Sequence, residues 1–158
     1  DEVVEPQLAP KDPIERARNR AWTDFTANWA GALNKVNYAQ TKKEHAAAVD
    51  ALPITLDKIE TVLNQRDNSG PYFNNNELCL VDAAYAPFLM RFNIVEKINP
   101  TRVLKDFPKI KAWSEALLKN DFVSGSVSED FPEVFEANLY KRETLASKIL
   151  DQRNAAAE

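Results

Sequence analysis

The sequence is poor in several residue types, and each shortage excludes a class of protein. Its 158 residues include three glycines, one cysteine and one histidine. So few glycines argue against a β-rich chain, which needs glycine in its tight turns. A single cysteine cannot form an internal disulfide, which fits a reducing compartment and predicts a cytoplasmic protein. The only histidine, His45, has no second ligand at a metal-binding spacing, so we expect no metal site.

Charge and hydropathy exclude two further kinds of partner. The net charge is −4, and an acidic chain is poorly suited to binding nucleic acid. The sequence has no apolar run of the roughly 18–20 residues that a membrane span needs, and no recognisable signal peptide. Apolar residues make up 44% of the chain, which at this length is enough for one domain with a hydrophobic core. We therefore expect a globular domain that binds neither nucleic acid nor membrane.

The stretch from Pro71 to Phe92 is the most informative part of the chain. A polar loop ends in a nearly all-apolar run, in which Asp82 is the only charge before Arg91. With Cys79 as N-cap, Asp82 takes the third helical position, where its carboxylate can accept hydrogen bonds from free backbone N–H groups. Neither residue has a base or second carboxylate at helical spacing, so a catalytic role is disfavoured. The pattern predicts a buried central helix with Cys79 and Asp82 as structural caps.

Helical periodicity and capping signals predict further helices on both sides of this stretch. No segment shows the alternation of a half-buried strand, so we expect an all-α bundle of five to seven helices. Its other elements would be one long helix from Asp12 to about Tyr38, a second from Thr41 to about Arg66 that Pro53 kinks or splits, a short turn at 101–105, a helix from Phe107-Pro108, and a last helix from Phe131 to about Leu150.

Tyr72-Phe73 and the run from Leu78 to Pro87 resemble the central helix of the glutathione S-transferase C-terminal domain. That family has a Ser/Thr-x-x-Asp capping box here. The acidic position matches at Asp82, whereas Cys79 stands in the Ser/Thr position. The resemblance implies the all-helical C-terminal fold of that family over residues 12–150. Residues 1–11 would then be a linker or the end of a preceding domain, and residues 151–158 a frayed tail.

The resemblance also implies a function shared between two domains. The parent reaction is conjugation of glutathione, the co-substrate, to electrophiles, and a thioredoxin-like N-terminal domain binds most of the glutathione. No strand pattern of such a domain precedes Asp12. We therefore expect this chain to contain no catalytic residue, to need no cofactor and to be inactive alone. Its expected partners are the thioredoxin-like domain, a second copy in a homodimer and hydrophobic small molecules.

An aromatic cluster on the first predicted helix supplies the candidate ligand residues. They are Trp22, Phe25 and Trp29, with Thr26 and Asn28 between them. Aromatic rings with a few polar groups suit a pocket wall, and the resemblance implies that this helix lines the hydrophobic co-substrate pocket. The alternative is a non-catalytic protein–protein interaction module with the same fold. An open cleft at the cluster would favour the pocket, and complete packing would favour the interaction module.

Overall fold

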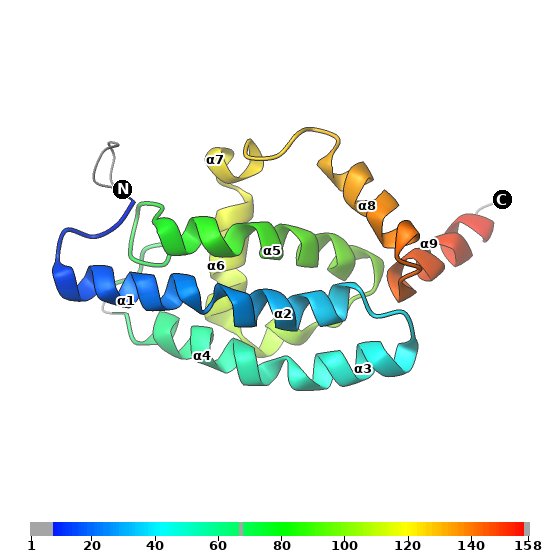
Figure 1. The fold of residues 1–158 in the computed structure, drawn as a ribbon, viewed down its shortest axis with the longest axis horizontal. Helices are drawn as coiled ribbons and strands as arrows, with labels where there is room; N and C mark the ends of the chain where they lie inside the picture. Colours follow the sequence, from blue (N-terminus) through cyan, green and yellow to red (C-terminus); the bar gives the residue numbers. More distant parts are fainter. Residues whose placement is uncertain (1–7, 67, 157–158) are drawn as a thin grey trace.

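The structure is a computed structural model that describes residues 8–66 and 68–156, and within these ranges it contains helices and no strand. This confirms the all-α fold. The pairs α1–α2 and α3–α4 each run end to end (Figure 1), so the described residues form seven helical rods, within the expected five to seven. The α-helices are α1 (Pro13–Asp24), α2 (Thr26–Asn37), α3 (Lys42–Ala51), α4 (Pro53–Asn64), α5 (Leu80–Ile98), α6 (Pro108–Leu118), α7 (Asp121–Ser124), α8 (Phe131–Lys141) and α9 (Leu145–Ala155), and a 3-10 turn, η1, spans Val103–Asp106.

Helix α5 lies in the middle of the molecule, with α1 and α2 along one side and α6 crossing it (Figure 1). Its buried side chains form the centre of the main core, as its apolar sequence predicts. A second, smaller cluster joins the end of α5 to α8 and α9 through Val95, Ile98, Phe135, Leu139 and Ala146. None of the helices in the described ranges is both long and apolar enough to cross a bilayer. The main core contains Trp29, Leu33, Leu56, Ile59, Tyr85, Leu89, Phe92, Ile110 and Trp113 among others.

The first two helical rods follow the predicted capping and proline signals, with one difference. Asp12 caps α1, and its Oδ1 accepts from the N–H groups of Ile14 (3.0 Å) and Glu15 (2.9 Å). The expected single helix to Tyr38 is interrupted at Phe25, which ends α1 and precedes α2. The predicted break before Pro53 is confirmed, because α3 ends at Ala51 and α4 begins at the proline.

The end of the chain differs from the prediction in two ways. The expected last helix from Phe131 to Leu150 is two helices, because Glu143 takes a left-handed conformation (φ 53°) that a helix cannot continue through. Thr144 then caps a new helix, its hydroxyl accepting from the Ser147 N–H at 3.2 Å. That helix, α9, continues to Ala155, so the frayed tail expected from residue 151 is wrong for residues 151–155.

Candidate functional site

The central helix begins at a carboxylate whose surroundings explain its place in the core. Asp82 has no exposed surface. Its Oδ1 accepts from the Phe73 N–H (2.9 Å) and the Trp113 indole Nε1 (2.7 Å), and its Oδ2 accepts from the Cys79 N–H (2.9 Å). Donors from two other segments and from the N-cap residue therefore give this buried carboxylate the hydrogen bonds that it needs. Asp82 therefore joins the start of α5 to α6, and its link to Trp113 was not predicted.

The only cysteine completes this helix start and is not a reactive thiol. Cys79 is the N-cap of α5, with extended backbone (φ −127°, ψ 176°), and it forms the expected capping-box arrangement with Asp82. The side chain is buried. Burial, together with the neighbouring Asp82 charge, raises the pKa of the Cys79 thiol to about 12. Because the thiolate is the nucleophile, this thiol is inert at neutral pH.

The five predicted ligand residues occupy different environments. Trp29 is fully buried, with its ring centroid 5.3 Å from that of Tyr85, so it lies in the core and not on the pocket wall that the sequence predicted. Trp22 and Phe25 are half-buried and form an edge-to-face pair at 5.7 Å. Thr26 is half-buried and Asn28 is exposed. The cluster is thus divided between the core and the surface.

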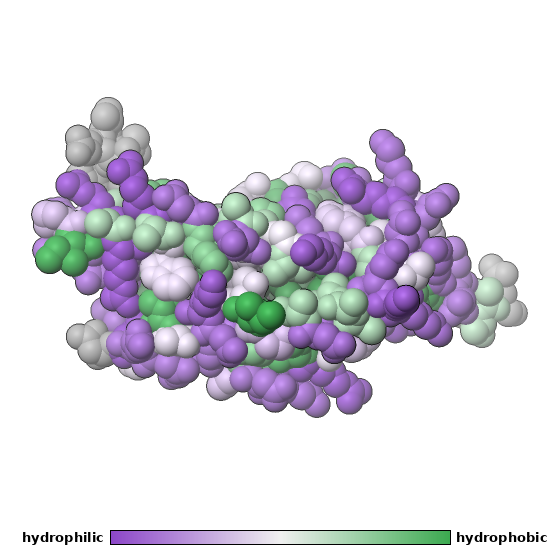
Figure 2. Space-filling view, turned by 60° about the horizontal axis from the view of Figure 1, so that its bottom comes forward, coloured by the Kyte–Doolittle hydropathy of each residue, from purple (hydrophilic) through white to green (hydrophobic). Residues whose placement is uncertain are grey.

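Trp22 and Phe25 line an open cleft between α1 and α4. The cleft has a volume of about 670 Å³, and charged side chains flank the aromatic rings. One of them, Lys58, places its Nζ 5.3 Å from the centroid of Phe25. Figure 2 turns the lower side of Figure 1 toward the viewer and shows hydrophobic patches between hydrophilic side chains along this side of the molecule. Ile14 (77% exposed) and Ile54 (71% exposed) lie one helical turn before the cleft residues of α1 and α4 and extend its apolar surface.

A second cavity lies along α1, bounded by residues 9–10 and the start of α5. Its volume is about 610 Å³, and its walls include the apolar residues Pro10, Pro13, Ala17 and Leu80 and the charged residues Arg16, Arg20 and Asp24. Asn19 lines it and is only 3% exposed. Within the part of the chain that the structure describes, neither amide atom of Asn19 has a hydrogen-bond partner. The burial of this residue was not predicted, because an asparagine among arginines on a polar helix indicates an exposed position.

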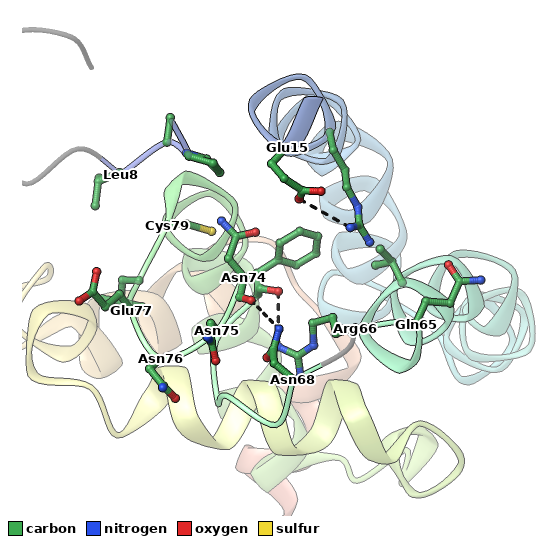
Figure 3. A pocket seen from close by; sticks show the side chains of 16 residues that line it. Leu8, Glu15, Gln65, Arg66, Asn68, Asn74, Asn75, Asn76, Glu77 and Cys79 are labelled. Atoms are coloured by element: carbon green, nitrogen blue, oxygen red, sulfur yellow. Dashed lines mark hydrogen bonds and ion pairs between the residues drawn. The ribbon is translucent and has the colours of Figure 1, made fainter. Parts of the chain in front are cut away.

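A third, polar cleft of about 860 Å³ lies where the loop before α5 passes the ends of α1 and α4 (Figure 3). Its arginines already have partners. Arg66 donates to the carbonyl groups of Leu63, Tyr72 and Phe73, and Arg18 pairs with Glu15 at 3.7 Å. The Arg66 contacts hold the loop against the end of α4. Among residues 8–66 and 68–156 there is no group of His, Cys, Asp and Glu side chains that could hold a metal ion.

Comparison with known proteins identifies the fold. The family model described as "Glutathione S-transferase, C-terminal domain" matches residues 23–124. The probable glutathione S-transferase GSTU6 of Oryza sativa subsp. japonica is 26% identical over 138 residues, covering 83% of this chain and 57% of that protein. Glutathione S-transferase L3 of Arabidopsis thaliana is 30% identical over 117 residues, covering 73% of this chain and 46% of that protein.

A solved structure agrees with these matches. The Tau class glutathione S-transferase MiGSTU from mango, Mangifera indica, superimposes with a TM-score of 0.69 at 24% identity, over 88% of this chain and 63% of that chain. The chain spans about half the length of the curated relatives it matches. By its sequence match and its fold, the chain belongs to the glutathione S-transferase family and corresponds to the C-terminal helical domain.

Proposed function

We propose that this chain is the helical domain of a glutathione S-transferase-like protein, in which one side of α1 lines the co-substrate pocket and the other contributes to a dimer interface. The parent reaction is conjugation of glutathione to an electrophile. The observation that carries the proposal is that α1 borders two different recesses, a cavity against residues 9–10 and Leu80 and an open cleft against α4.

The cavity beside Leu80 suits the electrophile. Its volume of about 610 Å³ lies within the range of small-molecule sites, and its wall combines apolar side chains with polar and charged ones, among them Arg16, Arg20 and Asp24. Residues 9–10 form part of its edge, so a domain joined to the N-terminal end of this segment would lie next to it. A thioredoxin-like domain there would bring glutathione to the electrophile, which is the arrangement that conjugation requires.

The α1–α4 cleft suits a second copy of the chain. Trp22 and Phe25 form an aromatic centre, charged side chains form a rim, and Ile14 and Ile54 extend the apolar surface. An apolar centre rich in aromatic residues and surrounded by a polar rim is the usual anatomy of a protein interface. Trp22 and Phe25, predicted as substrate-binding residues, are therefore proposed as contacts with a partner subunit.

The dimer interface can be tested with two exposed hydrophobic residues of similar size. Ile54→Lys places a charge on the α1–α4 face, and Phe122→Lys places one on α7, where Phe122 is 84% exposed. We expect sedimentation equilibrium to show a dimer that Ile54→Lys weakens by at least about tenfold, because burying an unpaired charge opposes association. Phe122→Lys should leave the dimer unchanged. A chain that stays monomeric at every concentration would contradict the interface.

If a preceding domain activates glutathione and this domain binds the electrophile, this chain should be inactive alone. Its only thiol is a buried cap, and activation of the glutathione thiol needs a positioned donor that the preceding domain would supply. We expect no measurable conjugation of glutathione to an aryl halide by the purified chain. Conjugation by the chain at a rate near that of a complete transferase would contradict this proposal. The single unpaired cysteine agrees with the proposed cytoplasmic location.

The alternative function, a non-catalytic protein–protein interaction module, has one observation in its favour. Trp29 is completely packed, as that hypothesis expects of the aromatic cluster. The module has no need of the cavity beside Leu80. Failure of every small aromatic probe to perturb that cavity would therefore favour the interaction module over the transferase pocket.

A further inference from the structure

Residues 8–10 form a short segment without helix or strand, which we call the strap. It lies between the start of α5 and the start of α1 (Figure 1). The main-chain N–H of Leu80 donates to the Leu8 carbonyl at 3.2 Å, which joins the strap to α5. Beyond its other end, Asp12 caps α1 and fixes the chain there. The strap therefore bridges the beginnings of two helices.

The hydrogen bond between the strap and Leu80 uses a donor that α5 cannot satisfy by itself. Leu80 is the first residue of α5, and the N–H groups of the first helical turn have no acceptor within the helix. The N–H of Cys79, one position earlier, is bound by the Asp82 carboxylate at 2.9 Å. Bonds to a charged group are roughly twice as strong as bonds between neutral groups. The strap is thus the more easily released part of this helix start.

The strap also separates two of the spaces described above. Ala9 and Pro10 line both the cavity beside Leu80 and the polar cleft of Figure 3. Both residues are half-buried, and the exposed Lys11 follows them. Between the two spaces at this point lies a chain segment with no helix or strand. Displacing the strap would therefore widen the cavity toward the polar cleft.

We propose that the strap is a movable wall of the cavity beside Leu80, closed while the Leu80 N–H holds the Leu8 carbonyl and open when the strap leaves α5. A small aromatic ligand enters past the displaced strap. Water can reach a donor at a helix start and replace the lost acceptor, so release of the Leu8 carbonyl costs little. This control of access rests on the proposed function, in which the same cavity is the co-substrate pocket.

Hydrogen exchange in the unsubstituted chain tests the joint between the strap and α5. Leu80 and Lys42 are the first residues of α5 and α3. Leu80 has the Leu8 carbonyl as acceptor, whereas the Lys42 N–H has no acceptor among the described residues. We expect the Leu80 N–H to exchange at least about fivefold more slowly, after correction for intrinsic rates, because one hydrogen bond is worth about that much. Equal exchange would overturn the proposal, whether or not any variant folds.

Leu80→Pro removes the donor and leaves the helix intact, because proline is tolerated at the first helical position and Cys79 before it is already extended. Leu80→Ala is the matched control, since it loses the same side chain and keeps the N–H. Trypsin should cut after Lys11 about fivefold faster in Leu80→Pro than in Leu80→Ala, because cleavage follows the open population. Anilinonaphthalene sulfonate, a fluorescent aromatic dye, should associate faster by a similar factor in stopped-flow measurements.

A second pair of variants shows whether the dye occupies this cavity. Ala17→Trp narrows the cavity and should weaken dye binding by at least about fivefold, whereas Ala27→Trp, exposed on α2 and outside the cavity, should not. If Ala17→Trp weakens binding but the two Leu80 variants are cut and bind dye at equal rates, the pocket stands and the movable wall is wrong. If Ala17→Trp has no effect, the proposed pocket is overturned, and exchange and cleavage still decide whether the strap opens.

Discussion

Helices α5 and α6 both begin at a buried carboxylate, but the two carboxylates come from different places. Asp82 belongs to the helix that it caps and accepts from the Cys79 N–H at the start of α5. Glu60 lies on α4, and its two oxygens accept from the Lys109 and Ile110 N–H groups of α6, each at 2.9 Å. The N-cap of α6, Phe107, provides no side-chain hydrogen bond. One helix start is therefore stabilised locally and the other by a residue about 50 positions away.

The difference has a consequence for how the bundle holds together. A local cap can form with its helix, whereas the Glu60 cap can form only when α4 and α6 are docked, so it couples helix formation to packing. Asp82 contributes to docking as well, because its Oδ1 also accepts from Trp113 in the middle of α6. Two carboxylates on different helices thus fix α6 at its beginning and at its centre.

The largest loss of stability is expected when Asp82, the carboxylate at the start of α5, is replaced. Asp82→Ala removes the acceptor for three buried donors, on Phe73, Cys79 and Trp113, and should lower the free energy of unfolding by about 3–5 kcal/mol. Asp82→Asn should cost less, because its amide oxygen can still accept from Phe73 and Trp113. Urea melts of both variants measure this. An Asp82→Ala variant that melts with the parent would show that the cap contributes nothing.

Replacing Glu60, which caps α6 from α4, should give a smaller and more localised loss of stability. Glu60→Ala leaves two backbone N–H groups of α6 without an acceptor. Because Glu60 is 8% exposed, water can replace part of the lost hydrogen bonding. We expect a loss of about 1–3 kcal/mol and faster hydrogen exchange at Lys109 and Ile110. Asp57→Ala, at an exposed site one turn earlier on α4, is the control. Unchanged exchange at both amides would mean that α6 does not depend on α4 for its start.

The same contrast explains which features were predictable from the sequence. The helix starts and breaks that depend on residues within a few positions lie where expected, at the Cys79–Asp82 cap, at Pro53 and at the Thr41–Glu44 capping box. Glu60 and Asn19 read as ordinary polar helix residues, because their roles depend on elements that meet only in three dimensions. Trp29 was misplaced for a related reason. Helical spacing groups it with Trp22 and Phe25, but the depth of each ring depends on how α2 packs against α5.

The thiol of Cys79, the N-cap residue of α5, provides a finer test of how this helix begins. Cys79→Ser replaces a weak sulfur acceptor with a hydroxyl, which is a preferred N-cap group, so stability should be unchanged or raised by up to about 1 kcal/mol. The parent thiol, with its pKa near 12, should resist iodoacetamide at neutral pH until urea unfolds the chain. Mass spectrometry after timed alkylation measures this. Rapid modification of the folded chain would show that the cap is open to solvent.

The smallest expected change in stability comes from a third long-range contact, at the other end of α5. His45 on α3 lies 3.0 Å from the side-chain nitrogen of Asn99, the C-cap of α5. Burial lowers the pKa of His45 below its ordinary value of about 6.5, and the charge of Glu96 opposes this shift in part. The unfolded chain therefore takes up a proton at a higher pH than the folded chain does. The contribution of His45 to stability is complete above about pH 6.5 and is lost as the pH falls toward the folded-state value.

This sign predicts a decrease in the urea midpoint between pH 7 and pH 5 that is smaller in His45→Gln, which can still hydrogen-bond to Asn99 but does not titrate. The difference should be small, because the ring is only partly buried and water screens its charge. Lys43→Gln, on the same helix but exposed, controls for the general effect of charge. If His45→Gln follows the parent at every pH, the contact between α3 and the end of α5 does not depend on a neutral imidazole. The two ends of α5 would then differ, with the carboxylate at its start bearing on stability and the histidine at its end only filling space.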